Sequence, residues 1–256
     1  MLEIPEESLK LQAVIASGMS RHTFALVTPS KDGAENRELA TGVGVKWREK
    51  YLLLTAAHVV DHCPNENLRF FPPKPEIQIA ANFAQPQPLT LHLQRLMEFK
   101  QPQSPVFAEH PVDLAAILLP PQPNADECFA LLEENATMPD DGAQVGVFGY
   151  PGAARIPADK SNVVVPEQFF DSLDLMNRLC QHEPRQDFTV PYDQPHPANG
   201  YSGSGVWYWQ EHPIWSPQPH LCGILASECL SDKIVSGFRI ETIIKFLQDN
   251  DDFIKS

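Results

Sequence analysis

The chain alternates short apolar runs with polar, proline-rich or glycine-containing turns, and this pattern predicts an all-β molecule. Thr41–Trp47 and Tyr51–Thr55 flank the charged triplet Arg48–Glu49–Lys50, which is typical of a β-hairpin. Further runs of strand length lie at Thr23–Val27, Ile77–Ala80, Leu89–Leu96, Leu114–Leu119, Val145–Gly149, Phe188–Val190 and Leu221–Ala226. Many short strands separated by turns favour a pair of β-barrels.

Two segments have helical spacing instead. Arg239–Gln248 places apolar side chains at i, i+3, i+4 and i+7, which predicts a C-terminal helix that docks on the body of the protein. Residues 166–181 repeat apolar side chains from Phe169 to Cys180 at a helical period, which predicts an inserted helix or a flap near a site. Residues 5–17 fit either a helix or a strand, and their acidic start favours the helix.

Composition and charge exclude several classes of function. The 256 residues are 43% hydrophobic, enough for a sizeable core, yet no run approaches the length of a membrane-spanning helix. A net charge of −14 repels phosphate backbones, so nucleic acid is not expected as a partner. The first residues lack the basic and apolar regions of a secretory leader, and we expect a cytoplasmic protein without a membrane partner.

The five cysteines are scattered and form no CxxC pair, which favours buried free thiols over a disulfide framework or a zinc site. We therefore expect no metal and no cofactor. The candidate chemistry lies elsewhere, in a serine turn and in two residues upstream of it.

The serine turn is Asn199–Trp207, in which glycines surround two serines. Glycine permits positive φ and lets a substrate carbonyl approach the main chain. The N–H groups of a serine and of a glycine two residues before it form an oxyanion hole in acyl transfer. Ser202 meets this condition with Gly200, whereas Ser204 has another serine at that position. The pattern therefore predicts Ser202 as a nucleophile.

Two further residues complete a catalytic set. His58 follows a predicted buried strand and two alanines, and Asp113 stands at the mouth of the apolar run Leu114–Leu119. A buried carboxylate needs a partner. A serine needs an imidazole to take its proton, and the imidazole needs a carboxylate to hold its tautomer. The three residues therefore predict nucleophilic catalysis.

These motifs resemble those of the trypsin-like, chymotrypsin-fold serine peptidases. The matching segments are Leu54–His58, Asp113–Leu118 and Gly200–Ser204, with support from Gly42–Val45, Gly149–Gly152, Cys222–Leu225 and the closing helix. The order His, Asp, Ser is that of this family. The resemblance implies one peptidase domain over residues 1–256. It would contain two six-stranded antiparallel β-barrels, at about 20–125 and 140–235, and a terminal helix at 239–248.

The resemblance also implies roles for individual residues. His58 would act as general base and then acid, Asp113 would orient it, Ser202 would attack, and the N–H groups of Gly200 and Ser202 would stabilise the oxyanion. The chain departs from the digestive enzymes at Val59, where they carry a disulfide cysteine. It also has Tyr201 before the serine, Gly205 in place of a proline, and no activation site. It therefore looks closer to bacterial intracellular members.

Substrate-binding residues are placed by the same resemblance. His196 falls at the base of the primary pocket, and Ala226, Ser227 and Glu228 fall on the strand edge that pairs with substrate backbone. Glu228 would attract a basic side chain, whereas His196 does not favour lysine or arginine. An ordinary loop role is the alternative for both residues.

Two functions remain open from the sequence. The first is a serine endopeptidase acting on protein or peptide substrates through an acyl-enzyme. The second is a catalytically silent trypsin-fold module that binds peptides or serves as a scaffold. Because no pro-segment is visible, we expect the resting site to be malformed at Gly200–Gly205 and assembled by an activating partner or larger assembly, in a stress or defence system.

Overall fold

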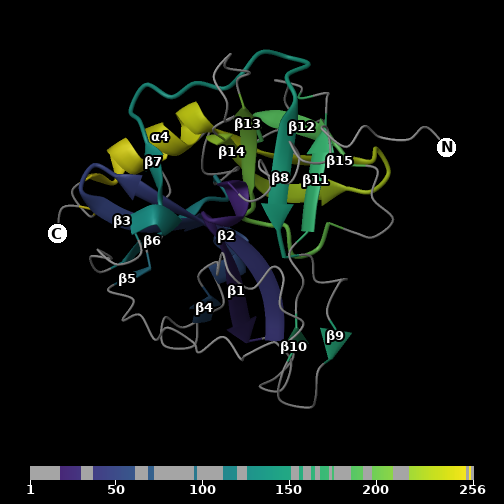
Figure 1. The fold of residues 1–256 in the computed structure, drawn as a ribbon, viewed down its shortest axis with the longest axis horizontal. Coiled ribbons are helices and arrows are strands. Elements are labelled where there is room, and N and C mark those ends of the chain that lie inside the picture. Colours follow the sequence, from purple (N-terminus) through teal and green to yellow (C-terminus); the bar gives the residue numbers. More distant parts are fainter. Residues whose placement is uncertain are drawn as a thin grey trace, which may run out of the picture.

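Two large β-sheets, a separate two-stranded pair and a C-terminal helix form most of the described part of the chain (Figure 1). The structure is a computed structural model. It describes residues 18–29, 37–60, 69–71, 95–96, 112–119, 126–150, 156–157, 163–164, 168–172, 175, 186–192, 198–209, 219–251 and 254. The predicted elements at 5–17, 77–80 and 89–94 lie outside these residues.

The first sheet grows from the predicted hairpin, which is confirmed. β2 (Arg37–Trp47) and β3 (Lys50–Thr55) pair antiparallel, with Trp47 opposite Lys50. Within the described ranges the sheet has the order β4–β1–β2–β3–β6–β5. The other strands are β1 (Thr23–Pro29), β4 (Arg69–Phe71), β5 (Arg95–Leu96) and β6 (Ala115–Leu119). A short 3-10 turn (Asp126–Cys128) leads to β7 (Ala130–Leu132), which pairs parallel with β2, an exception to the antiparallel pattern.

The second sheet is built from the later strands, in the order β11–β8–β13–β14–β15–β12. Its strands are β8 (Val145–Gly149), β11 (Gln168–Ser172), β12 (Phe188–Pro191), β13 (Gly205–Trp209), β14 (Pro219–Cys229) and β15 (Ile234–Arg239). A separate pair is formed by β9 (Ile156–Pro157) and β10 (Val163–Val164). The expected two-barrel, all-β class with a terminal helix is confirmed.

The prediction of an inserted helix at residues 166–181 is wrong for the part of this segment that the structure describes. Residues 168–172 form β11, which pairs with β8 from Gln168 opposite Gly149 to Ser172 opposite Val145. Adjacent aromatic residues suit a strand, and the edge of β8 supplies hydrogen-bonding partners that a local helical period does not reveal. Elsewhere in this segment the structure describes Leu175, which is buried.

Several strands bury both faces, which is why their apolar runs are continuous. Leu52 and Leu54 join a core that is shared by both sheets and the terminal helix, whereas Leu53 joins a second core within the first sheet. In β13, Trp207 joins the shared core and Val206 joins a third core within the second sheet.

The terminal helix closes the shared core. α4 (Ile240–Asp249) buries its predicted stripe of Ile240, Ile243, Ile244 and Leu247, which confirms the helix expected from the sequence. It contacts β14 and β15 and lies beside the first sheet (yellow in Figure 1). No helix among the described residues is both long and apolar enough to cross a membrane.

Candidate active site

His58 and Asp113 are brought together by the pairing of β3 with β6. The antiparallel register places Thr55 opposite Ala115, so the residues just beyond these strand ends meet. His58 lies in the short helix α2 (Ala57–Val60), and Asp113 lies two residues before β6. His58 Nδ1 lies 2.6 Å from Asp113 Oδ2, and the backbone N–H of His58 donates to Asp113 Oδ1 at 2.8 Å.

Both oxygens of Asp113 therefore hold the same residue. A carboxylate at this distance accepts the Nδ1 proton, so the neutral imidazole carries its lone pair on Nε2. The His58 side chain is 49% exposed, which leaves the ring accessible to a substrate. Because the His58–Asp113 pair is partly solvated, it contributes little to the free energy of unfolding, and its main effect is to orient the imidazole ring.

Ser202 lies in a double turn formed by residues 198–204. The N–H of Tyr201 donates to the carbonyl of Ala198 at 2.9 Å, and the N–H of Ser204 donates to the carbonyl of Tyr201 at 2.8 Å. Gly200 and Gly203 have φ of 98° and 86°, which L residues rarely adopt. The glycine pattern of the sequence is thus used for its backbone freedom.

A buried threonine of the first sheet fastens this turn. The N–H of Thr41 in β2 donates to the carbonyl of Ser202 at 3.0 Å, and the Thr41 hydroxyl donates to the carbonyl of Gly200 at 2.7 Å. The same hydroxyl accepts the N–H of Tyr150 at 3.0 Å. From the second sheet, the carbonyl of Leu225 accepts the N–H of Gly203 at 2.8 Å. The serine turn is therefore held between both sheets.

The strand that leads to His58 touches this turn. The Thr55 hydroxyl donates to the carbonyl of Thr41 at 2.8 Å, and a Cβ added at Gly203 would overlap that hydroxyl. His58 follows Thr55 by three residues, so their Cα atoms lie within about 11 Å of each other. His58 therefore follows closely on a residue that contacts the serine turn.

The hydrogen bonds that hold the serine turn do not use the backbone N–H groups of Gly200 and Ser202. Among the backbone–backbone hydrogen bonds of the described residues, neither group donates. These are the two donors that the sequence predicts for an oxyanion. Donors held in place by a rigid turn stabilise a developing negative charge.

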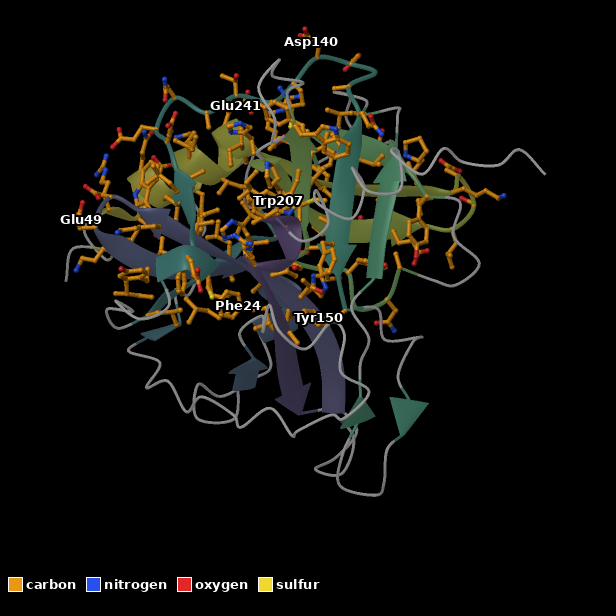
Figure 2. The ribbon with its side chains drawn as sticks, viewed as in Figure 1. Phe24, Glu49, Asp140, Tyr150, Trp207 and Glu241 are labelled. Carbon is orange, nitrogen blue, oxygen red and sulfur yellow. The ribbon has the colours of Figure 1, made fainter. Side chains whose placement is uncertain are left out.

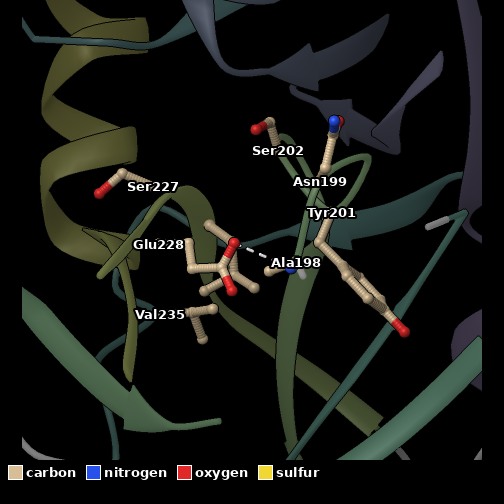
Figure 3. Close-up of a pocket in the computed structure, with 8 residues that line it drawn as sticks. Ala198, Asn199, Tyr201, Ser202, Ser227, Glu228 and Val235 are labelled. Carbon is tan, nitrogen blue, oxygen red and sulfur yellow. Dashed lines mark hydrogen bonds between the residues drawn. The ribbon is translucent and has the colours of Figure 1, made fainter. Parts of the chain in front are cut away.

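A cavity of about 230 Å³ opens beside Ser202 (Figure 3). It is lined by Ala198, Asn199, Tyr201, Ser202, Leu225, Ser227, Glu228 and Val235. Ser227 and Glu228, predicted from the sequence to bind substrate, thus share a pocket with the predicted nucleophile. Ala226 does not line it and is packed in the shared core. His196 lies outside the described residues.

Two of the lining residues are also fixed by contacts outside the cavity, Ser227 by polar contacts and Tyr201 by aromatic packing. The Ser227 hydroxyl donates to Gln186 Oε1 at 2.8 Å and lies 3.1 Å from the hydroxyl of Ser236. Tyr201 is buried, packs edge-on against Tyr192, and points away from Ser202 (Figure 3). Burial raises the pKa of the Tyr201 phenol, so the ring is a neutral support for the turn.

Sequence reasoning missed Thr41. Its run was predicted as a strand, but its role depends on Gly200, which is 159 residues away. No local pattern marks such a contact.

No group of three or more His, Cys, Asp or Glu side chains in the described ranges could hold a metal ion.

Comparison with known proteins supports the fold. No protein-family model and no curated protein matches the chain. An inactivated protease paralogue from the scabies mite is similar in structure, with a TM-score of 0.59 and 14% identity over 93% of this chain and 97% of the other. Human heparin binding protein gives a TM-score of 0.58 and 11% identity, covering 91% and 92% of the two chains.

The Rv3671c protease of M. tuberculosis, solved in its active form, gives a TM-score of 0.53 and 13% identity, covering 96% and 87%. The chain therefore has the trypsin/chymotrypsin fold. Since an inactivated paralogue and an active protease share it, the fold alone does not decide the chemistry, and the site residues must.

Proposed function

We propose that the protein is a serine endopeptidase that hydrolyses peptide bonds with Ser202 as nucleophile, His58 as general base and Asp113 as orienting carboxylate. The observation that carries the proposal is the His58–Asp113 pair, with both carboxylate oxygens on the histidine. Its support is the serine turn, which Thr41 joins to the same sheet.

In the proposed mechanism, each of these residues has a separate role. The Ser202 hydroxyl attacks the scissile carbonyl while His58 Nε2 takes its proton, and Asp113 stabilises the imidazolium that forms. The N–H groups of Gly200 and Ser202 bind the oxyanion. His58 then gives the proton to the leaving amine, and water hydrolyses the acyl-enzyme by the same route. Each oxyanion donor contributes about 100- to 1,000-fold in turnover.

Regulation by a partner is the second part of the proposal. A stress or defence system in the cytoplasm would keep the chain at rest until an activating protein or larger assembly completes the site. This stays a prediction. Full activity of the purified chain on unstructured protein would contradict it.

A fluorophosphonate probe tests the catalytic assignment directly. We expect the wild type, alone or with its activator, to be labelled at one serine, and Ser202→Ala to lose that labelling completely, because the proposed mechanism activates the Ser202 hydroxyl. Ser204→Ala is the matched control and should still be labelled. Labelling of Ser202→Ala at the wild-type level would end the proposal.

A catalytically silent peptide-binding module is the second candidate. The scabies mite neighbour, described as an inactivated protease paralogue, favours it, since its structure retains the fold. A chain that binds peptides but never reacts with the probe would support this function over the first.

A further inference from the structure

The cavity beside Ser202 contains one negative charge whose hydrogen bonding is incomplete. Glu228 Oε2 accepts the N–H of Ala198 at 2.9 Å, whereas Oε1 is buried and has no hydrogen-bond partner. Figure 3 shows the carboxylate between Ala198 and Val235. A carboxylate oxygen that is shielded from water and unpaired is destabilising unless a donor or a cation satisfies it.

None of the described lining residues supplies that partner. Apart from Glu228, the lining residues within the described ranges have apolar or neutral side chains, with no lysine, arginine or histidine among them. The nearby phenol of Tyr192 adds no competing charge, because burial and then the charge of Glu228 raise its pKa to about 12. The cavity therefore has the polarity of a site for a cation.

We infer that Glu228 binds a cationic substrate side chain, that of the residue whose carbonyl Ser202 attacks. This rests on the proposed function. When a carbonyl carbon lies at Ser202, the side chain of the same residue is only two bonds from it, so it is the one that enters the adjoining cavity. Leu225, Val235 and Ala198 offer apolar contacts for an aliphatic stem.

The carboxylate geometry favours an ammonium over a guanidinium. Arginine gains most from a fork that meets two carboxylate oxygens, but the Ala198 N–H already engages one of them. A lysine ammonium is a compact point charge that needs a single acceptor. The substrate class is thus peptides cleaved after lysine, with arginine second.

Matched peptide substrates test this inference. We expect kcat/KM for lysine to exceed that for norleucine, which has the same stem without charge, by about 10- to 100-fold. Glu228→Gln keeps an acceptor for Ala198 and should remove this preference, whereas Glu49→Gln, which removes an equal charge from an exposed turn, should keep it. Equal rates for lysine and norleucine in the wild type would overturn the inference.

A binding measurement separates this inference from the catalytic proposal. We expect n-butylammonium chloride to shift the NMR signal of the Ala198 amide in the wild type but not in Glu228→Gln, and n-butanol to shift neither. The result is independent of turnover. Fluorophosphonate labelling without any ammonium effect would leave the peptidase standing and refute the Glu228 site. An ammonium effect without fluorophosphonate labelling would support the Glu228 site and count against the peptidase assignment.

Discussion

At the scale of single residues, Thr41 connects more of the site than any residue that sequence reasoning selected. Its N–H and hydroxyl donate to the carbonyls of Ser202 and Gly200, and its own carbonyl accepts the Thr55 hydroxyl. The side chain is completely buried. It therefore orients the peptide groups beside both predicted oxyanion donors, as a positioning residue that need not touch the substrate.

Replacing Thr41 with valine should lower turnover more than it weakens substrate binding. The hydroxyl is lost at constant shape, which leaves the carbonyl of Gly200 and the N–H of Tyr150 unpaired at a cost of about 1–3 kcal/mol in unfolding free energy. We expect kcat and affinity for a peptide boronic acid to fall about tenfold or more, with KM unchanged, and Thr41→Ser to recover most of both. A loss of thermal stability alone would show that Thr41 serves only the fold.

At the scale of elements, the serine turn and the end of β3 fit together because Gly203 has no side chain. Its φ of 86° and the nearness of the Thr41 carbonyl and Thr55 hydroxyl both require glycine. Gly142 provides a comparison, since it has φ of 79° but nothing within 4 Å of an added Cβ.

Alanine substitutions at these two glycines should separate backbone strain from steric overlap. Gly142→Ala should cost about 1–2 kcal/mol in unfolding free energy, the penalty of a left-handed backbone alone. Gly203→Ala should cost at least about 2 kcal/mol more, because it also displaces Thr41 and Thr55, and it should abolish probe labelling. Urea denaturation measures both. Equal losses of unfolding free energy in the two variants would show that the contacts of Gly203 with Thr41 and Thr55 do not require glycine.

At the scale of the whole molecule, His22 joins the two sheets. Its carbonyl accepts the N–H of Gly44 in β2 at 2.8 Å, and its ring stacks on Trp207 of β13 with centroids 5.5 Å apart. Trp207 lies in the interior between the sheets (Figure 2). Burial lowers the pKa of His22 below 6.5, although a hydrogen bond with the backbone of Cys128 opposes this.

Acidic pH should therefore weaken the packing between the two sheets and lower the free energy of unfolding. Between pH 6.5 and the lower folded pKa, the unfolded chain binds a proton at His22 that the folded chain does not. Stability is thus full above pH 6.5 and falls as the pH drops toward the folded pKa, by up to about 1.4 kcal/mol per pH unit. Urea midpoints at pH 7.5, 6.5 and 5.5 should fall more for the wild type than for His22→Phe, which keeps the stacking. An equal fall of the urea midpoint in the wild type and in His22→Phe would contradict a role for His22 in the pH dependence.

Elements whose signals are local could be predicted from the residues alone. The hairpin of β2 and β3 and the stripe of α4 could be predicted because each depends on residues a few positions apart. The chemical types at His58, Asp113 and Ser202 could be chosen because catalysis by a serine needs them together. The pairing of β3 with β6, which brings His58 to Asp113, joins segments that are distant in sequence and was not predicted.

Features that depend on partners distant in sequence could be seen only in the folded chain. Residues 168–172 became a strand because the edge of β8 was free to pair with them, against their own helical period. The fastening of the serine turn by Thr41 and the cavity that isolates one oxygen of Glu228 arise where separate segments meet. Hydrogen bonds and burial at such places are set by packing between segments, and no spacing along the chain encodes them.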